Sequence, residues 1–212
     1  MASLRGQNTG APRAIIFDIG GVIIRVQLSL AFSTLGADTG LSAEQVWQAI
    51  QTDPSWGDWQ EGRMTPRSWY EHLTKKFSLS FTFDEFSETW NRVLDPVTIL
   101  PDALFETLAS RCRLALLSNT DPIHVAHMEA TFAFVRHFPV RTYSCQVGST
   151  KPAASIYRHT LQALNVSPNE ALYIDDIQEY AAAAALLGMN AFQFTSPSEL
   201  YAGLARLGLI PL

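Results

Sequence analysis

Short, fully apolar runs separated by longer amphipathic stretches are the feature that most limits how this chain can fold. Residues 14–17 (AIIF) form such a run, in which no polar position is left to face water. A strand of this kind is buried on both faces, as strands are in parallel sheets. Residues 114–117 and 172–174 repeat the pattern, and 191–194 and 143–145 are weaker candidates for two further strands.

Helix-start and helix-stop residues lie between these runs. Strands that alternate with helices form βαβ units, which build a parallel sheet with helices on both faces. The predicted fold class is therefore α/β and Rossmann-like. The helix signals are Asp121-Pro122, Ser196-Pro197-Ser198-Glu199, a segment between Pro152 and Asn165, and an alanine-rich segment from Gln178 that ends at Gly188.

Residues 28–100 have a different pattern. Ser42 with Gln45 and Thr82 with Glu85 match the capping box that starts a helix. The apolar residues there recur every three or four positions, and all five tryptophans belong to this stretch. We therefore expect a loose tail over 1–13, a sheet domain made of 14–27 and 101–212, and a helical insert over 28–100.

Composition limits the partners and the compartment. The 212 residues are 47% hydrophobic and 17% charged, which is typical of a globular chain with one ample core. The net charge is −5 and the basic residues are scattered, so we expect no nucleic-acid or membrane partner. No apolar run is long enough to span a bilayer, the start lacks a signal-peptide pattern, and Cys112 and Cys145 form no paired motif. These features predict a cytoplasmic protein, and they leave its oligomeric state open.

Polar residues follow the predicted strands, at the edge where parallel sheets bind ligands. Asp18 and the flexible pair Gly20-Gly21 follow the first strand. Ser118 and Asn119 end the second, where a hydroxyl and an amide near a helix N-terminus suit an anion. Each motif alone is also explained by a turn or by helix capping.

Two further motifs complete this series. Lys151 stands just before a predicted helix and can neutralise a phosphate, although most lysines are simply solvated. Asp175 and Asp176 are adjacent carboxylates, which repel each other unless a cation or hydrogen bonds compensate. Carboxylate oxygens are the ligands that Mg²⁺ prefers. The alternative is a pair that caps the next helix.

Taken in order, the motifs FDIGGV, LLSNT, GSTKP and YIDD resemble those of the haloacid-dehalogenase-like hydrolase superfamily. The resemblance extends from about Ala14 to the C-terminus and puts the helical insert where that family has an α-helical cap. DxGG, SNT, KPxxxIY and the cap sequence WQEGRMT are most similar to the branch that contains sugar-phosphate phosphatases.

The resemblance implies a magnesium-dependent phosphatase that hydrolyses a small phosphorylated metabolite, with a sugar phosphate as one candidate. Asp18 would attack phosphorus and form an aspartyl-phosphate. Mg²⁺ would be held by Asp18, by the carbonyl of Gly20, by Asp175 and, through water, by Asp176; Ser118, Asn119 and Lys151 would bind the phosphate oxygens.

Two positions depart from the family pattern. Gly20 stands where many family phosphatases have a second Asp that acts as general acid and base, and Tyr180 stands where an Asn is common. His124 is a candidate replacement proton donor, with a partly exposed helix histidine as the alternative. Asp58 and Glu61 are weaker candidates. Trp56 and Trp59 lie in an apparent loop from which one could face the substrate.

Two other functions remain open from the sequence. In a 2-haloacid dehalogenase, Asp18 would attack carbon instead of phosphorus and no metal would be needed. The Asp175-Asp176 pair favours a metal site and therefore a phosphatase. Alternatively, Gly20 and Tyr180 could mark a degenerate site that is kept for binding alone.

Overall fold

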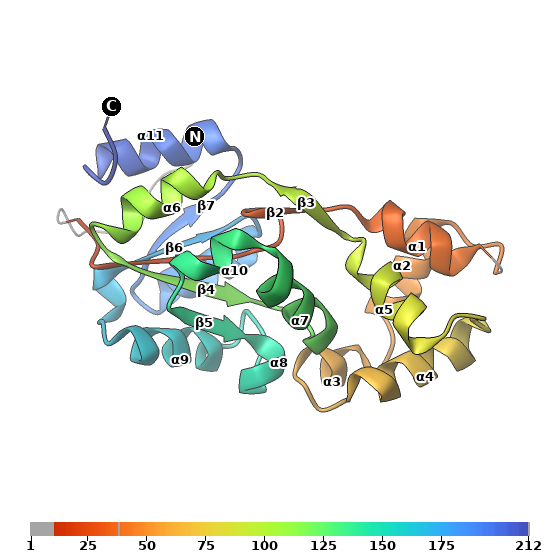
Figure 1. Ribbon diagram of the computed structural model, residues 1–212. Coiled ribbons are helices and arrows are strands. Elements are labelled where there is room, and N and C mark those ends of the chain that lie inside the picture. The colour runs from red at the N-terminus through yellow and green to blue at the C-terminus, as the bar shows by residue number, and fades with distance from the viewer. Residues whose placement is uncertain (1–10, 38, 212) are drawn as a thin grey trace.

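A computed structural model describes residues 11–37 and 39–211 (Figure 1). The predicted loose tail therefore lies largely outside the described residues. At its described end, Arg13 donates its backbone N–H to the carbonyl of Glu170 at 2.8 Å and forms an ion pair with the Glu170 carboxylate at 2.8 Å. The main chain is thus held in place at Arg13.

A five-stranded parallel sheet forms the centre of the molecule, in the order β5-β4-β1-β6-β7. Its central strand is completely buried, as a run without polar positions requires. The sheet confirms the predicted Rossmann-like α/β class. The strands are β1 (Ala14–Phe17), β4 (Arg113–Ser118), β5 (Val140–Tyr143), β6 (Ala171–Asp175) and β7 (Asn190–Gln193).

Helices cover both faces of this sheet (Figure 1). Ile15 and Phe17 of β1 point to one face and Ala14 and Ile16 to the other, because side chains alternate along a strand. The first face packs against α6 (Asp102–Ala109), α7 (Pro122–Thr131) and α11 (Pro197–Arg206), and the second against α9 (Ala154–Leu164) and α10 (Gln178–Leu186). No helix in the described part of the chain is both long and apolar enough to cross a membrane.

The segment between β1 and α6 forms a second hydrophobic core at one end of the sheet (Figure 1). Trp59, Trp69 and Trp90 are fully buried at its centre. Both predicted capping boxes are present, at Ser42 and Thr82. The elements are α1 (Leu28–Gly36), α2 (Ala43–Gln51), α3 (Trp56–Gln60), α4 (Pro66–Phe77) and α5 (Phe83–Asn91), joined to the sheet domain by the antiparallel pair β2 (Ile24–Val26) and β3 (Leu94–Thr98).

Two local predictions are corrected by the structure, and the choice between Trp56 and Trp59 is narrowed. The fifth strand ends at Tyr143, and Ser144 begins the short helix α8 (Ser144–Val147), so the predicted strand over 143–145 is displaced. The apparent loop at Trp56 and Trp59 is the short helix α3. Trp59 is fully buried and stacks on Trp69 with ring centroids 5.4 Å apart, so it is a core residue that cannot face a substrate.

Leucines at two positions allow the central core to be tested. We expect Leu116→Ala, at a fully buried position in the middle of β4, to lower the free energy of unfolding by about 2–5 kcal/mol through lost burial and a cavity. The matched control is Leu186→Ala, because Leu186 is 89% exposed and should change stability by less than about 0.5 kcal/mol. Urea unfolding of both variants makes the comparison, and equal effects would contradict the assignment of β4 to the core.

Candidate active site

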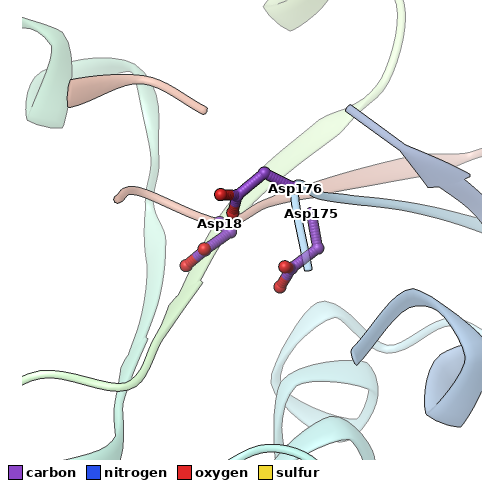
Figure 2. A group of neighbouring side chains, drawn as sticks. All are labelled: Asp18, Asp175 and Asp176. Carbon is purple, nitrogen blue, oxygen red and sulfur yellow. The ribbon is translucent and has the colours of Figure 1, made fainter. Parts of the chain in front are cut away.

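Three carboxylates meet at the carboxyl edge of the sheet. Asp18 follows β1, and Asp175 and Asp176 stand at the end of the neighbouring strand β6. Each side chain offers one oxygen atom, and these atoms lie within 4.8 Å of one another (Figure 2). The parallel register, with Phe17 opposite Ile174, explains the proximity, because both strands reach the same edge together.

Lys151 reaches this cluster from the loop before α9. Its ammonium nitrogen lies 2.8 Å from Asp18 Oδ1 and 2.8 Å from Asp175 Oδ2, and its side chain is 1% exposed. Burial alone would lower the pKa of Lys151, but the two carboxylates outweigh burial and raise it. The surroundings of Lys151 therefore favour its charged form, although the side chain is buried.

Hydrogen bonds fix the positions of Lys151 and Asp175. The Asn119 side chain accepts from the Lys151 backbone N–H at 2.7 Å and donates to the Lys151 carbonyl at 3.0 Å. Fully buried Asp175 accepts from the Tyr173 hydroxyl and, at 2.8 Å, from the Ile177 backbone N–H. Both residues thus enter the site in one defined orientation.

Asp176 has a different environment. Its Oδ1 is buried and has no hydrogen-bond partner among the described residues. Gly21 leaves the room for this carboxylate, because a Cβ at Gly21 would lie 2.3 Å from Asp176 Oδ2, and its φ of +77° also favours glycine. A buried oxygen without a partner is costly unless a ligand satisfies it.

The charges of the cluster indicate what that ligand is. Burial, and after it the neighbouring Asp175 carboxylate, raises the pKa of Asp176. Burial also raises the pKa of Asp18, against the opposing effect of Lys151. One lysine among three carboxylates leaves an excess of negative charge, which a divalent cation would balance. The all-oxygen donor set fits Mg²⁺.

The remaining predicted binding residues lie beside the carboxylates. Ser118 ends β4 and is 5% exposed, and Gly20 follows β1; both border one cavity, together with Asn119. The sequence predicted a phosphate-binding amide at Asn119. In the structure, the oxygen and one N–H of that amide bind the Lys151 backbone, and the amide also lies beside the Tyr180 hydroxyl.

His124 lies in the same region, but its imidazole is already bonded. Its Nδ1 is 2.9 Å from Asp121 Oδ2, and its Nε2 is 3.1 Å from the carbonyl of Trp90 in α5. The ring also stacks on Trp90 with centroids 5.8 Å apart. In this conformation no ring nitrogen is left for a substrate, and the observed role of His124 is to join α7 to α5.

The two weaker proton-donor candidates also have partners. Asp58 pairs with Arg63 at 2.6 Å on the surface. Glu61 contacts Arg63 and accepts a hydrogen bond from Thr150 at 3.1 Å, so it connects the insert to the loop that holds Lys151.

Several residues that shape the site were missed by the sequence analysis. Gly62 has φ +70°, and a Cβ there would lie 1.9 Å from the Cys145 carbonyl oxygen, so the insert approaches the sheet domain closely at this point. Ser144 Oγ lies 2.7 Å from the Gln60 carbonyl and 2.9 Å from the Thr120 carbonyl, across the same junction. The glycine in WQEGRMT was visible in the sequence, but nothing local to Ser144 or Tyr173 indicated a role.

The structure thus brings three carboxylates and a buried lysine together at the carboxyl ends of parallel strands, where sheets of this kind bind ligands. A sequence model of the haloacid dehalogenase-like hydrolases matches residues 12–188. The chain belongs to this family. Membership confirms the predicted family and enzyme class, and the prediction of Mg²⁺ as cofactor holds at the level of the family and fits the carboxylate cluster.

Relatives and structural neighbours agree with this assignment. The chain is 27% identical over 191 residues to a D-ribitol-5-phosphate phosphatase of Bacteroides thetaiotaomicron, covering 84% of this chain and 90% of the relative. It is 23% identical over 186 residues to a sesquiterpene phosphatase of Aspergillus oryzae, covering 86% and 90%. A HAD family enzyme of B. thetaiotaomicron, solved with magnesium and inorganic phosphate, shares the fold with a TM-score of 0.77 and 21% identity over 90% of this chain and 99% of that one.

The His124–Asp121 pair predicts a pH-dependent stability. Burial lowers and Asp121 raises the pKa of His124, with a net shift upward from about 6.5. A raised histidine pKa stabilises the fold below pH 6.5, and this stability is lost as the pH rises through the raised pKa. We therefore expect His124→Gln to cost about 1.5–3 kcal/mol at pH 6, where wild type keeps a charged hydrogen-bonded pair, and less as the pH increases.

His127→Gln, in the same helix, is the matched control. Burial, and after it the nearby His124, lowers the pKa of His127. The folded state therefore favours neutral His127. Protonation of His127 at low pH should lower the free energy of unfolding, and this loss should disappear as the pH rises. Denaturant unfolding across pH 5.5–9 measures both variants. The same pH trend for the two would contradict the assigned ion pair.

Proposed function

We propose that the chain is a magnesium-dependent phosphatase in which Asp18 attacks the phosphorus of a small phosphate ester. The convergence of Asp18, Asp175, Asp176 and Lys151 is the observation that supports this proposal most strongly. The resulting aspartyl-phosphate would be hydrolysed by water and so regenerate Asp18. Relatives named as phosphatases are consistent with it.

The side chains have separate tasks in this proposal. Asp18, Asp175, the Gly20 carbonyl and, through water, Asp176 would hold Mg²⁺, which lowers the repulsion between the Asp18 carboxylate and the phosphoryl group. Lys151 stabilises the charge that develops on the phosphoryl oxygens from a position that is already desolvated. Ser118 and the second N–H of Asn119 would bind those oxygens.

Proton transfer to the leaving group is the step for which the site is least equipped. Gly20 provides no side chain, and His124 could act only if its hydrogen bond to Trp90 opened. General acid catalysis contributes about 10²–10⁴-fold to rates, so its absence would slow the hydrolysis of all esters of primary alcohols alike. The relatives are named for a sugar-alcohol phosphate and for a sesquiterpene, so the family accepts different leaving groups.

The nucleophile is tested by a single change. We expect Asp18→Asn to reduce phosphate release from a panel of phosphorylated metabolites to background, because an amide cannot form the acyl-phosphate bond. Asp58→Asn is the matched control, since Asp58 is an exposed carboxylate paired with Arg63. Full activity of Asp18→Asn would disprove the proposed nucleophile. Absence of activity in wild type as well would favour a degenerate, binding-only site.

Metal removal separates a phosphatase from a dehalogenase. We expect EDTA to abolish phosphate release and added Mg²⁺ to restore it, because the buried excess of carboxylates needs a cation beside the substrate phosphate. Ca²⁺ at the same concentration serves as the control for non-specific ionic effects. Chloride release from 2-chloropropionate that is indifferent to EDTA would instead support the dehalogenase alternative.

A further inference from the structure

A cavity of about 150 Å³ lies between the insert and the carboxyl edge of the sheet. The base of the cavity is formed by Ile19, Gly20, Ser118 and Asn119. Ile19 and Gly20 come directly after Asp18 at the end of β1, and Ser118 and Asn119 lie at the end of the neighbouring strand β4. A phosphate ester attacked by Asp18 would therefore extend its alcohol portion into this cavity.

The walls of the cavity are mostly aromatic and aliphatic. Phe32 stacks on Trp47 with centroids 5.2 Å apart, and Trp47 meets Trp56 edge to face at 5.5 Å. These contacts hold the rings in fixed orientations, so the surface is formed before a ligand arrives. The apolar residues that define it are Leu28, Phe32, Trp47, Trp56, Trp90 and Val93.

Six polar residues line the cavity, and the side chains of three of them, Asp121, His124 and Asn119, are already bonded within the protein. Ser118 is assigned to the phosphate in the proposed function, which leaves Thr120 and Gln60 for the alcohol portion. Asp121 accepts from the Trp90 indole N–H at 3.0 Å, from two backbone N–H groups and from His124. His124 and Asn119 have the partners described above. Gln60 adds one amide to the lining. A polyhydroxylated alcohol would need several hydrogen-bond partners there, and burying hydroxyls without them costs free energy.

Size leads to the same conclusion as chemistry. An apolar cavity of about 150 Å³ is large enough to bind benzene. The cavity beside Asp18 has about this volume, so one ring or a short branched chain would fill it. Filling it would remove apolar surface of both ligand and protein from water. A long chain would have to extend out of the cavity.

We propose that the substrate is a phosphate monoester of an apolar alcohol, either a single-ring aryl-methyl alcohol or a short branched alkyl alcohol, with the apolar group seated in this cavity. This inference rests on the proposed phosphatase function of Asp18 and narrows its substrate class.

Substrates with the same type of leaving group test the proposal. We would compare kcat/KM for benzyl phosphate and 3-methylbutyl phosphate with kcat/KM for D-ribitol 5-phosphate and glycerol 3-phosphate, all esters of primary alcohols. The apolar esters should be favoured on the order of 100-fold, the discrimination that a hydrophobic pocket gives against added hydroxyls. Faster hydrolysis of the two polyol phosphates would overturn the proposal and leave the phosphatase function intact.

Two leucines of α1 provide a variant and its matched control. Leu28 lines the cavity, whereas Leu30 is 48% exposed on the same helix. Leu28→Gln should lower the ratio of kcat/KM for benzyl phosphate to kcat/KM for D-ribitol 5-phosphate about tenfold or more, because it replaces an apolar contact in the cavity with a polar one. Leu30→Gln should leave this ratio unchanged. An equal loss for both substrate classes in Leu28→Gln would contradict the proposal.

A binding measurement separates this inference from the proposed function. If none of the esters is hydrolysed, the phosphatase proposal fails. Tryptophan fluorescence then shows whether the apolar group binds in the cavity. Trp47, Trp56 and Trp90 line the cavity, so benzyl phosphate should produce a saturable change that D-ribitol 5-phosphate at the same concentration does not. The absence of any saturable change would overturn the inference as well.

Discussion

The buried ammonium of Lys151 between Asp18 and Asp175 is the interaction on which the site depends. A desolvated lysine is stable only where carboxylates compensate it, and these carboxylates come from β1 and β6. The contact therefore joins the loop before α9 to the two central strands. It also positions a fixed positive charge beside the aspartate that would attack phosphorus, so charge stabilisation is built into the fold before a substrate arrives.

The same cluster explains why a metal belongs there. One lysine does not balance three carboxylates, and Asp176 keeps a buried oxygen without a partner among the described residues. Gly21 leaves the space that the Asp176 carboxylate occupies. The observed arrangement is thus complete in its protein contacts except at the place where an oxygen-preferring divalent cation would bind.

The insert contributes the other half of the site. Its aromatic core positions Trp47, Trp56 and Trp90 along one cavity, and the contact of Trp90 with Asp121 and His124 attaches that wall to α7 of the sheet domain. The two halves meet at the cavity that Ile19 and Gly20 border, so in the proposed reaction the sheet domain would supply the chemistry and the insert would select the alcohol portion of the substrate. Such a division would allow the leaving group to change while the nucleophile stays the same.

The alternation of apolar runs and helix signals in the sequence was enough to predict the parallel sheet, the helical insert and the polar residues at the strand ends, because each of these depends on local periodicity and on the order of motifs. The tertiary structure alone decided how individual side chains are used. It buried Trp59, engaged both nitrogens of His124, and turned the Asn119 amide toward the Lys151 backbone. Trp90, a hydrogen-bond partner of His124, is 34 residues away in the sequence. No local sequence pattern predicts a contact between two residues so far apart.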